Sequence, residues 1–313
     1  MNQLFSLKNK SLTSLDSVPF KLEKEIQDII ENNTEELFGL RMVKSEFTVG
    51  DFRLDSLCFD EETKSFVIIE YKRDKSYSVI DQGYSYLSTM LNNKSDFVLE
   101  YNETLKETLK RNEIDWTQSR IIFVSPSFSS YQKTSVDFKD VPFELWEISR
   151  FSNNTIGLNQ ISSTSKESIK AVGKEKGTVI KNVTDEIEVS NEDSHLSNVS
   201  PNVRSLYFEL KERLFTWDGA DFRFKKAHIS ILNKNKVKGY LNIQKNQIKI
   251  HLLRRIDFKG DVTSQKVIFD LKDPNSLFEL KKGSHKEQYE YLLKDDSDLD
   301  YVVMMMKQKY SPI

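Results

Sequence analysis

The sequence predicts an α/β domain followed by a smaller α+β domain. With 313 residues, the chain is long enough for two ordinary domains, and its 38% hydrophobic and 11% aromatic content suits folded cores. The composition changes after residue 151: Ser152 to Ser200 contains no aromatic residue, and Ser, Asn, Thr, Lys and Glu dominate. We therefore predict a first domain over 1–151, a flexible polar linker over 152–200 and a second domain over 201–313.

The first domain is expected to form a central mixed sheet flanked by helices. Leu22, Ile26, Ile29 and Ile30 make an apolar stripe that predicts a helix over 22–38. VGDFRLD alternates as a strand that ends at Asp55, and a turn-prone acidic stretch separates it from the strand SFVIIEYK. A second helix is predicted over 79–92. RIIFVS (120–125) and VPFELWEIS (141–149) are apolar enough for strands of a sheet covered on both faces.

Three charged residues on the two central strands suggest a metal-dependent site. Glu70 and Lys72 project from the same face of their strand, and pairing of the two strands as a hairpin brings Asp55 back towards Glu70. Two carboxylates can hold Mg²⁺ or Mn²⁺, which stabilises the extra phosphate charge in phosphodiester cleavage, while a lysine positions or deprotonates the attacking water. The alternative is structural: a strand-end aspartate and an exposed Glu70–Lys72 ion pair. Ionised groups on so apolar a strand are costly without a bound partner, which favours the metal site.

The spacing of Asp55, Glu70 and Lys72 resembles the PD-(D/E)XK nuclease superfamily over residues 20 to 125, about a third of the chain. Upstream, KLEKEIQDIIENNTEELFGLRMVKSEF resembles the helix preceding the catalytic strands in NucS-like members. Downstream, Gln82 to Tyr86 matches the Gln-x-x-x-Tyr motif of RecB-like members. Leu54 stands where proline is common in the superfamily.

The resemblance implies a restriction-endonuclease-like fold and further site residues. The first helix of the superfamily usually supplies a glutamate to the metal, here Glu23, with Glu25 as the alternative. The other reading of either residue is an acid that favours a helix start. Gln82 would brace the lysine or contact the phosphate. Tyr86, four residues later on the same helix face, is either part of the site or packing.

The second domain is predicted to hold an antiparallel meander between helices at about 201–216 and 286–309. GYLNIQ and QIKIHLL alternate as strands, with a turn near Lys245 and Asn246. Residues 223–256 contain ten basic residues and no acidic one, which suggests a nucleic-acid surface with Tyr240 or Phe224 exposed. The alternative is a solvated face whose lysines prevent edge pairing. The basic residues expected to bind nucleic acid are Lys234, Lys236, Lys238, Lys249, Arg254 and Arg255. Region 201–313 also resembles an uncharacterised domain that follows nuclease domains in bacterial proteins labelled "predicted transport protein".

The net charge of −2 hides an asymmetry between the two predicted domains. Residues 1–151 hold 19 Lys/Arg against 26 Asp/Glu, whereas residues 201–313 hold 22 against 15. No apolar run is long enough to cross a bilayer, the N-terminus lacks a signal-peptide pattern, and the single cysteine, Cys58, excludes a disulfide framework. These features indicate a bacterial cytoplasmic protein.

The function expected from the sequence is a Mg²⁺- or Mn²⁺-dependent DNA endonuclease serving restriction, phage defence or repair. A homodimer is compatible with this function. Asp55 and Glu70 would ligate the metal, Lys72 would align or activate water, and Glu23 would assist through the metal or its waters. One alternative is a nucleic-acid-binding module that has lost useful catalysis. Another is an interaction protein whose second domain senses a ligand or partner.

Overall fold

The computed structural model describes residues 4–73, 78–163, 165–169, 178–234, 236–258, 266–282 and 287–310. The chain divides into two compact units, Met1–Val189 and Ser190–Ile313. Each unit has its own hydrophobic core and its own six-stranded sheet, so each is described by itself.

The first unit is built on a mixed sheet with strand order β3-β4-β5-β6-β7-β8. The antiparallel strands β3, β4 and β5 are joined by short turns, β5, β6 and β7 run parallel, and β8 returns antiparallel to β7. This confirms the mixed α/β architecture predicted for the first domain. The strands are β3 (Arg41–Val49), β4 (Phe52–Asp60), β5 (Ser65–Tyr71), β6 (Arg120–Ser125), β7 (Phe143–Arg150) and β8 (Ile156–Ile161).

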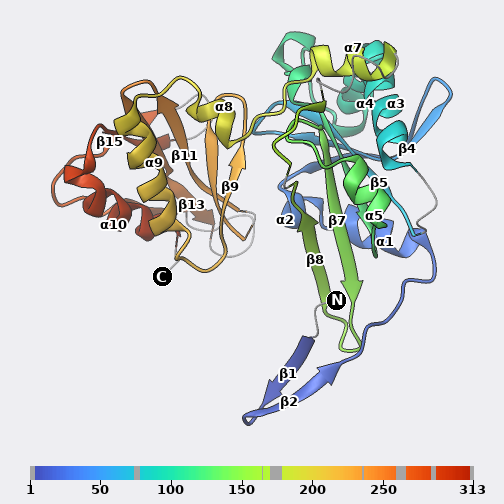
Figure 1. The fold of residues 1–313 in the computed structure, drawn as a ribbon, viewed down its shortest axis with the longest axis horizontal. Coiled ribbons are helices and arrows are strands. Elements are labelled where there is room, and N and C mark those ends of the chain that lie inside the picture. The colour runs from blue at the N-terminus through green and yellow to red at the C-terminus, as the bar shows by residue number, and fades with distance from the viewer. Residues whose placement is uncertain are drawn as a thin grey trace. The chain divides into compact units, whose positions relative to one another are not determined.

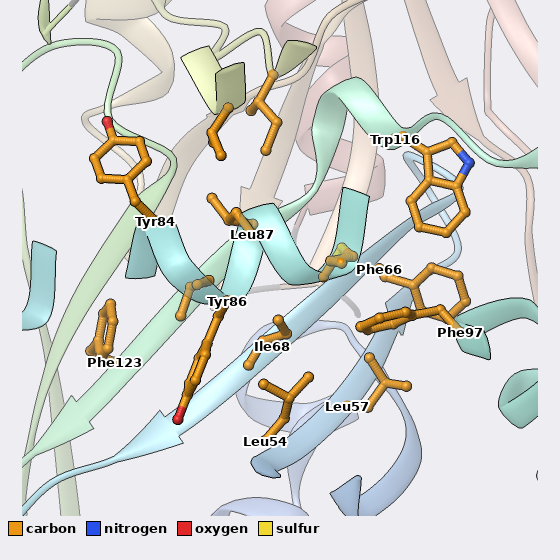
Figure 2. Packing of buried hydrophobic residues seen from close by; sticks show 14 of the residues in the cluster. Leu54, Leu57, Phe66, Ile68, Tyr84, Tyr86, Leu87, Phe97, Trp116 and Phe123 are labelled. Carbon is orange, nitrogen blue, oxygen red and sulfur yellow. The ribbon is translucent and has the colours of Figure 1, made fainter. Parts of the chain in front are cut away.

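Helices cover both faces of this sheet because alternate residues of β5 are apolar on both sides. Phe66 and Ile68 belong to the core beneath α3 and α4, and Val67 and Ile69 to the core beneath α1. Figure 2 shows Phe66, Ile68, Leu54 and Leu57 packed under α3. The helices are α1 (Glu23–Glu31), α2 (Thr34–Phe38), α3 (Val79–Asn92), α4 (Lys94–Leu105), α5 (Ser130–Ser135) and α7 (Thr178–Glu186), with 3₁₀ turns at Arg111–Glu113 and Trp116–Gln118.

The helix predicted over 22–38 is two helices. The first ends at Asn32, and α2 begins after Asn33, whose backbone is not helical. Both asparagine side chains bond backbone carbonyls four residues earlier, which competes with continuation of the helix. The predicted helix 79–92 coincides with α3, whose first turn is capped by the Ser78 hydroxyl.

Parts of the segment predicted as a flexible polar linker, 152–200, are folded against the first unit. The segment contributes β8 to the sheet edge, and α7 packs against α3. Ile169, Val183 and Ile187 are buried in the first core, so a few aliphatic side chains in a polar background anchor the segment. The boundary between the two units lies between residues 189 and 190, inside the predicted linker.

An N-terminal hairpin precedes the first helix and was not predicted. Its strands, β1 (Leu4–Lys8) and β2 (Ser11–Leu15), pair with each other. Asn9 and Lys10 both have positive φ values, 49° and 65°, as a two-residue type I′ turn requires. Figure 1 shows the hairpin standing out from the first unit, beyond the ends of β7 and β8.

The second unit is an antiparallel sheet, order β15-β16-β12-β11-β10-β9, with helices packed on its apolar face. The predicted hairpin is present as β11 and β12, and Leu241, Ile248, Ile250 and Leu252 are buried as expected. The predicted helix 286–309 is wrong in its first half, where β16 pairs with β12. The elements are α8 (Glu192–Leu196), α9 (Pro201–Leu214), β9 (Ala220–Phe224), β10 (Ile229–Asn233), β11 (Lys236–Gln244), β12 (Gln247–Leu253), β13 (Arg255–Phe258), β14 (Lys266–Phe269), β15 (Glu279–Lys282), β16 (Glu287–Leu293), a 3₁₀ turn (Asp296–Asp298) and α10 (Leu299–Tyr310).

Among the helices that the structure describes, none has the length and apolar character needed to cross a membrane.

Candidate active site

The structure brings Asp55, Glu70 and Lys72 together at the carboxyl end of β5. The register pairs Ser56 with Ile69, so Asp55 stands one residue further along, opposite Glu70. The backbone N–H of Tyr71 donates to Asp55 Oδ2 over 2.9 Å, and Lys72 Nζ donates to Glu70 Oε1 over 2.7 Å. The hairpin of β4 and β5 thus places both carboxylates and the amine in one cluster.

Burial makes this cluster electrostatically unusual. The Glu70 side chain is 3% exposed and that of Lys72 13%. Burial, followed by the negative charge of Asp55, raises the pKa of Glu70 to about 7, although Lys72 opposes this shift. Burial also raises the pKa of Asp55, against the hydrogen bond from the Tyr71 N–H. Without a further positive charge, the two carboxyls therefore do not both ionise readily at neutral pH.

The first turns of α3 complete the surroundings of Glu70. Gln82 Nε2 donates to Glu70 Oε1 over 2.7 Å and to the Tyr86 hydroxyl over 2.8 Å. The Tyr86 hydroxyl donates to the same Glu70 oxygen over 3.3 Å. Figure 2 shows Tyr86 reaching from α3 with its hydroxyl towards the end of β5. Gln82 therefore holds the glutamate rather than the lysine, and Tyr86 is more than packing.

α3 can approach the sheet this closely because residue 83 is a glycine. A β-carbon at Gly83 would lie 2.5 Å from the ring of Phe143 on β7. The glycine thus allows the helix face carrying Gln82 and Tyr86 to reach Glu70.

A divalent cation fits the oxygen atoms that this arrangement leaves without partners. Glu70 Oε1 accepts three hydrogen bonds, whereas Glu70 Oε2 and Gln82 Oε1 are buried and have no hydrogen-bond partner. Hard cations such as Mg²⁺ and Mn²⁺ prefer carboxylate and amide oxygens. Asp55, Glu70 and the Gln82 carbonyl are the groups that would hold the ion. No cluster of three or more His, Cys, Asp or Glu side chains suited to a metal occurs among the described residues, so two carboxylates are the acidic ligands on offer.

The glutamates proposed from the first helix do not contact the carboxylates of this cluster in the described part of the chain. Glu23 is exposed in the first turn of α1, and Glu25 forms an ion pair with Arg150 over 3.0 Å. No hydrogen bond or ion pair joins either to Asp55 or Glu70 within the described part of the chain. A catalytic role for Glu23 stays a prediction.

Two other α1 side chains, Gln27 and Glu31, reach the strand that carries Asp55, and the sequence analysis missed them. Gln27 Nε2 donates to the backbone oxygen of Asp55 over 3.3 Å and to Glu31 Oε1 over 2.8 Å. The Ser56 hydroxyl donates to Glu31 Oε1 over 2.6 Å and lies 2.8 Å from the Tyr71 hydroxyl. This network fixes the residues next to Asp55 and Glu70 from the opposite face of the sheet. Two polar residues four apart, beside the apolar stripe, were the available signal.

Several basic residues predicted to bind nucleic acid pair with acids in the second unit. Lys249 lies 3.3 Å from Glu290, and Lys234 lies 3.6 Å from Asp218. Arg254 pairs with Asp270 over 2.7 Å and also with Glu287.

The remaining predicted positions of this surface differ in exposure, and one of them lies outside the described side chains. Lys236 is exposed and Lys238 half-buried. The side chain of Arg255 lies outside the described part of the structure. Tyr240 and Phe224 are half-buried, and Tyr240 packs edge-on against His228.

Comparison with known proteins places the chain beside a bacterial relative. An uncharacterized protein of Haemophilus influenzae is 38% identical over 311 residues, which span 98% of both chains. The chain belongs to the family of this Haemophilus protein. No family model matches the sequence.

Two solved structures are partly similar to the present chain. A repair endonuclease from Pyrococcus abyssi is 17% identical, with a TM-score of 0.23 over 43% of this chain and 61% of that chain. EndoMS in complex with double-stranded DNA is 18% identical, with a TM-score of 0.24 over 47% of this chain and 64% of that chain. The matched regions thus span less than two thirds of either endonuclease.

Proposed function

We propose that the protein is a divalent-metal-dependent nuclease that hydrolyses phosphodiester bonds in DNA. The observation that carries the proposal is the state of Glu70. One of its oxygens is held by three donors and the other is buried without a partner, opposite the half-buried carboxylate of Asp55. Such an arrangement is costly for a purely structural role, because an unsatisfied buried carboxylate has lost its hydration. A cation that binds there removes the cost.

In this proposal, the residues around the cation have different roles. When bound, Mg²⁺ or Mn²⁺ would supply Lewis-acid stabilisation of charge on the phosphate. Asp55 and Glu70 hold the site's negative charge, and their strands fix the spacing between them. Lys72 Nζ donates to Glu70, and in this proposal it would orient the attacking water and stabilise negative charge as it develops. Gln82 and Tyr86 restrict Glu70 to one rotamer.

A non-catalytic binding or regulatory protein is the second candidate. The number of acids favours it: the described residues gather two carboxylates at the site, whereas the sequence analysis expected a third from the first helix. A fold that kept Glu70 in its network but lost a further ligand would bind a cation or nucleic acid weakly and cleave poorly.

Incubation of the purified protein with supercoiled plasmid, single-stranded DNA and RNA distinguishes the two functions. Each substrate is tested with Mg²⁺, Mn²⁺ and EDTA. The nuclease proposal predicts cleavage that requires the metal and is lost in Glu70→Gln and Asp55→Asn. Glu103→Gln, an equivalent change at an exposed α4 position, is the matched control and should keep full activity. Metal-independent cleavage, or equal activity in Glu70→Gln, would contradict the proposal.

A further inference from the structure

The N-terminal hairpin, residues 4–15, has the composition of a binding arm rather than of a core element. Phe5, Leu7 and Leu12 are 46%, 70% and 65% exposed, and Leu7 lies directly opposite Leu12 across the two strands. An isolated two-stranded hairpin is only marginally stable in water, and exposed apolar side chains add nothing to its stability. These residues therefore indicate a surface that another molecule covers.

The hairpin is joined to the end of the sheet that carries the candidate active site. β5, β6 and β7 run parallel, so their C-terminal ends, Tyr71 in β5 and Arg150 in β7, lie at the same end of the sheet. Residues 16–22 connect the hairpin to the first helix, and backbone hydrogen bonds hold this connecting segment at that end of the sheet. The Val18 N–H donates to the Arg150 carbonyl over 2.8 Å, and the Ser152 N–H donates to the Asp16 carbonyl over 2.9 Å. Ser17 forms an isolated antiparallel bridge with Phe151.

A second contact ties the connecting segment to the residue after Lys72. Arg73 Nη1 donates to the Lys21 carbonyl over 2.5 Å, and the Arg150 guanidinium stacks over the ring of Phe20 at 4.8 Å. The base of the hairpin is thus fixed between the candidate lysine and the end of β7. With strands of five residues, the hairpin extends about 17 Å beyond this base.

The charge of the hairpin identifies the class of partner. Residues 4–15 contain two lysines, Lys8 and Lys10, and no acidic residue, whereas residues 1–151 as a whole carry more acids than bases. Both lysines are exposed: Lys8 directly precedes the turn at the tip, and Lys10 is the second residue of that turn. A positive tip on an otherwise negative domain is complementary to a polyanion. It is poorly suited to pairing with a second copy of the same hairpin, because lysines on strand edges oppose such pairing.

Resting on the proposed nuclease function, we propose that this hairpin is an arm that binds duplex DNA beside the active site. A two-stranded ribbon fits the major groove of B-DNA, and apolar side chains contact bases in a groove while lysines contact phosphates. Lys8 and Lys10 would bind the backbone, and Leu7 and Leu12 would enter the groove. The two-residue turn places both lysines next to the leucine pair along the hairpin.

Binding measured separately from cleavage tests this proposal. Fluorescence anisotropy of a labelled duplex is recorded with full-length protein in a Glu70→Gln background across a range of salt concentrations. Lys8→Gln with Lys10→Gln removes two phosphate contacts, so the slope of log K against log salt should fall by about 1.8. Leu7→Ser with Leu12→Ser should weaken duplex binding at every salt concentration and leave this slope unchanged.

The matched control is Lys106→Gln with Lys110→Gln, the same charge change at two exposed lysines of the first unit outside the hairpin. It should leave both affinity and slope unchanged. Single-stranded DNA and double-stranded RNA of the same length should bind more weakly than the duplex and respond less to the leucine variant.

Four results separate the explanations. A smaller slope in the lysine variant alone supports the proposal. Equal slopes in the lysine and control variants overturn it, while wild-type cleavage of DNA would leave the nuclease function standing. Analytical ultracentrifugation tests whether the hairpin instead binds a second copy of the chain. If the hairpin variants have a lower oligomer mass and unchanged DNA binding, the hairpin is a contact between copies and the DNA-arm proposal is wrong. If the wild-type protein neither binds nor cleaves nucleic acid, both proposals fail.

Discussion

The candidate site of the first unit and the basic sheet of the second unit show opposite relations between sequence and space. Asp55, Glu70 and Gln82 come from three different elements, β4, β5 and α3, and converge on one site. The ten basic residues of 223–256 lie in one continuous stretch without an acid, but in space Lys249 and Arg254 pair with acids from other strands and loops. Charge that is clustered along a chain is therefore not charge that is available to a ligand. The more informative sign is buried charge that the protein leaves unsatisfied.

The largest expected effect comes from Glu70, because it combines burial, a neighbouring acid and an unpaired oxygen. Glu70→Gln keeps the shape but removes the charge that a divalent ion needs, so we expect metal-dependent cleavage to fall by about 10³-fold or more. The measurement is the initial rate of plasmid nicking at saturating Mg²⁺. Lys249→Gln, made in the second unit, should leave this rate unchanged. A similar loss of cleavage rate in Glu70→Gln and Lys249→Gln would contradict the proposed difference between the candidate site and the basic sheet.

The raised pKa of Glu70 makes the stability of the metal-free protein depend on pH. The folded protein keeps a proton on Glu70 up to pH of about 7, whereas the ordinary value of a glutamate is 4.5. Between these values the folded state binds more protons than the unfolded state, so the free energy of unfolding falls as pH rises and levels off above 7. The full change amounts to about 3 kcal/mol.

Melting curves in EDTA and in Mg²⁺ measure this dependence. In EDTA, Glu70→Gln should lose the decline in melting temperature relative to wild type between pH 5 and 8. Added Mg²⁺ should stabilise the wild type at pH 8 and have little effect at pH 5, because the ion binds the ionised pair. Equal stabilisation by Mg²⁺ at both pH values would show that the ion binds elsewhere.

Gln82 and Tyr86 are expected to matter less than Glu70, because both position Glu70 and neither side chain carries the negative charge that a divalent cation needs. Tyr86→Phe removes one of three donors to Glu70 Oε1, and Gln82→Ala removes another. We expect metal affinity to fall by about 10-fold in Tyr86→Phe and by about 100-fold in Gln82→Ala, as for other residues that orient metal ligands. The readout is the Mn²⁺ concentration at half-maximal activity. Unchanged values in both variants would reduce these residues to packing.

The smallest expected effect concerns the basic sheet. Since Lys249 already pairs with Glu290, Lys249→Gln should change the salt dependence of DNA binding by less than about 0.5 in slope, against a full contact value near 0.9. Replacing Lys234, Lys236 and Lys238 together with glutamine tests the more exposed part of the surface by the same anisotropy titration. A large effect of Lys249→Gln would show that DNA displaces Glu290.

The residues at the end of β5 could be predicted from the sequence because their constraints are local. Alternation along SFVIIEYK determines that Glu70 and Lys72 share a face, and the helical period determines that Gln82 and Tyr86 share another. The partners of these residues could not be predicted in the same way. Gln27, Glu31 and Ser56 meet through helix packing on the far face of the sheet, which no periodicity specifies.

The same contrast explains the errors in the fold. The predicted linker was assigned from average composition, but Ile169, Val183 and Ile187 attach parts of it to the core and β8 pairs with β7. The predicted helix over 286–309 included EQYEYLL, yet pairing with β12 makes this segment a strand, β16. The N-terminal hairpin depends on a turn, Asn9-Lys10, that lacks the usual glycine.

Calorimetric titration of Mn²⁺ at pH 7.5 into the metal-free wild type, Glu70→Gln and Glu103→Gln tests the central claim most directly. The claim is that buried Glu70 and half-buried Asp55 together form a divalent-cation site. We predict one ion per chain for the wild type and for Glu103→Gln, and loss of that binding in Glu70→Gln. Equal Mn²⁺ affinity in the wild type and Glu70→Gln would contradict the account.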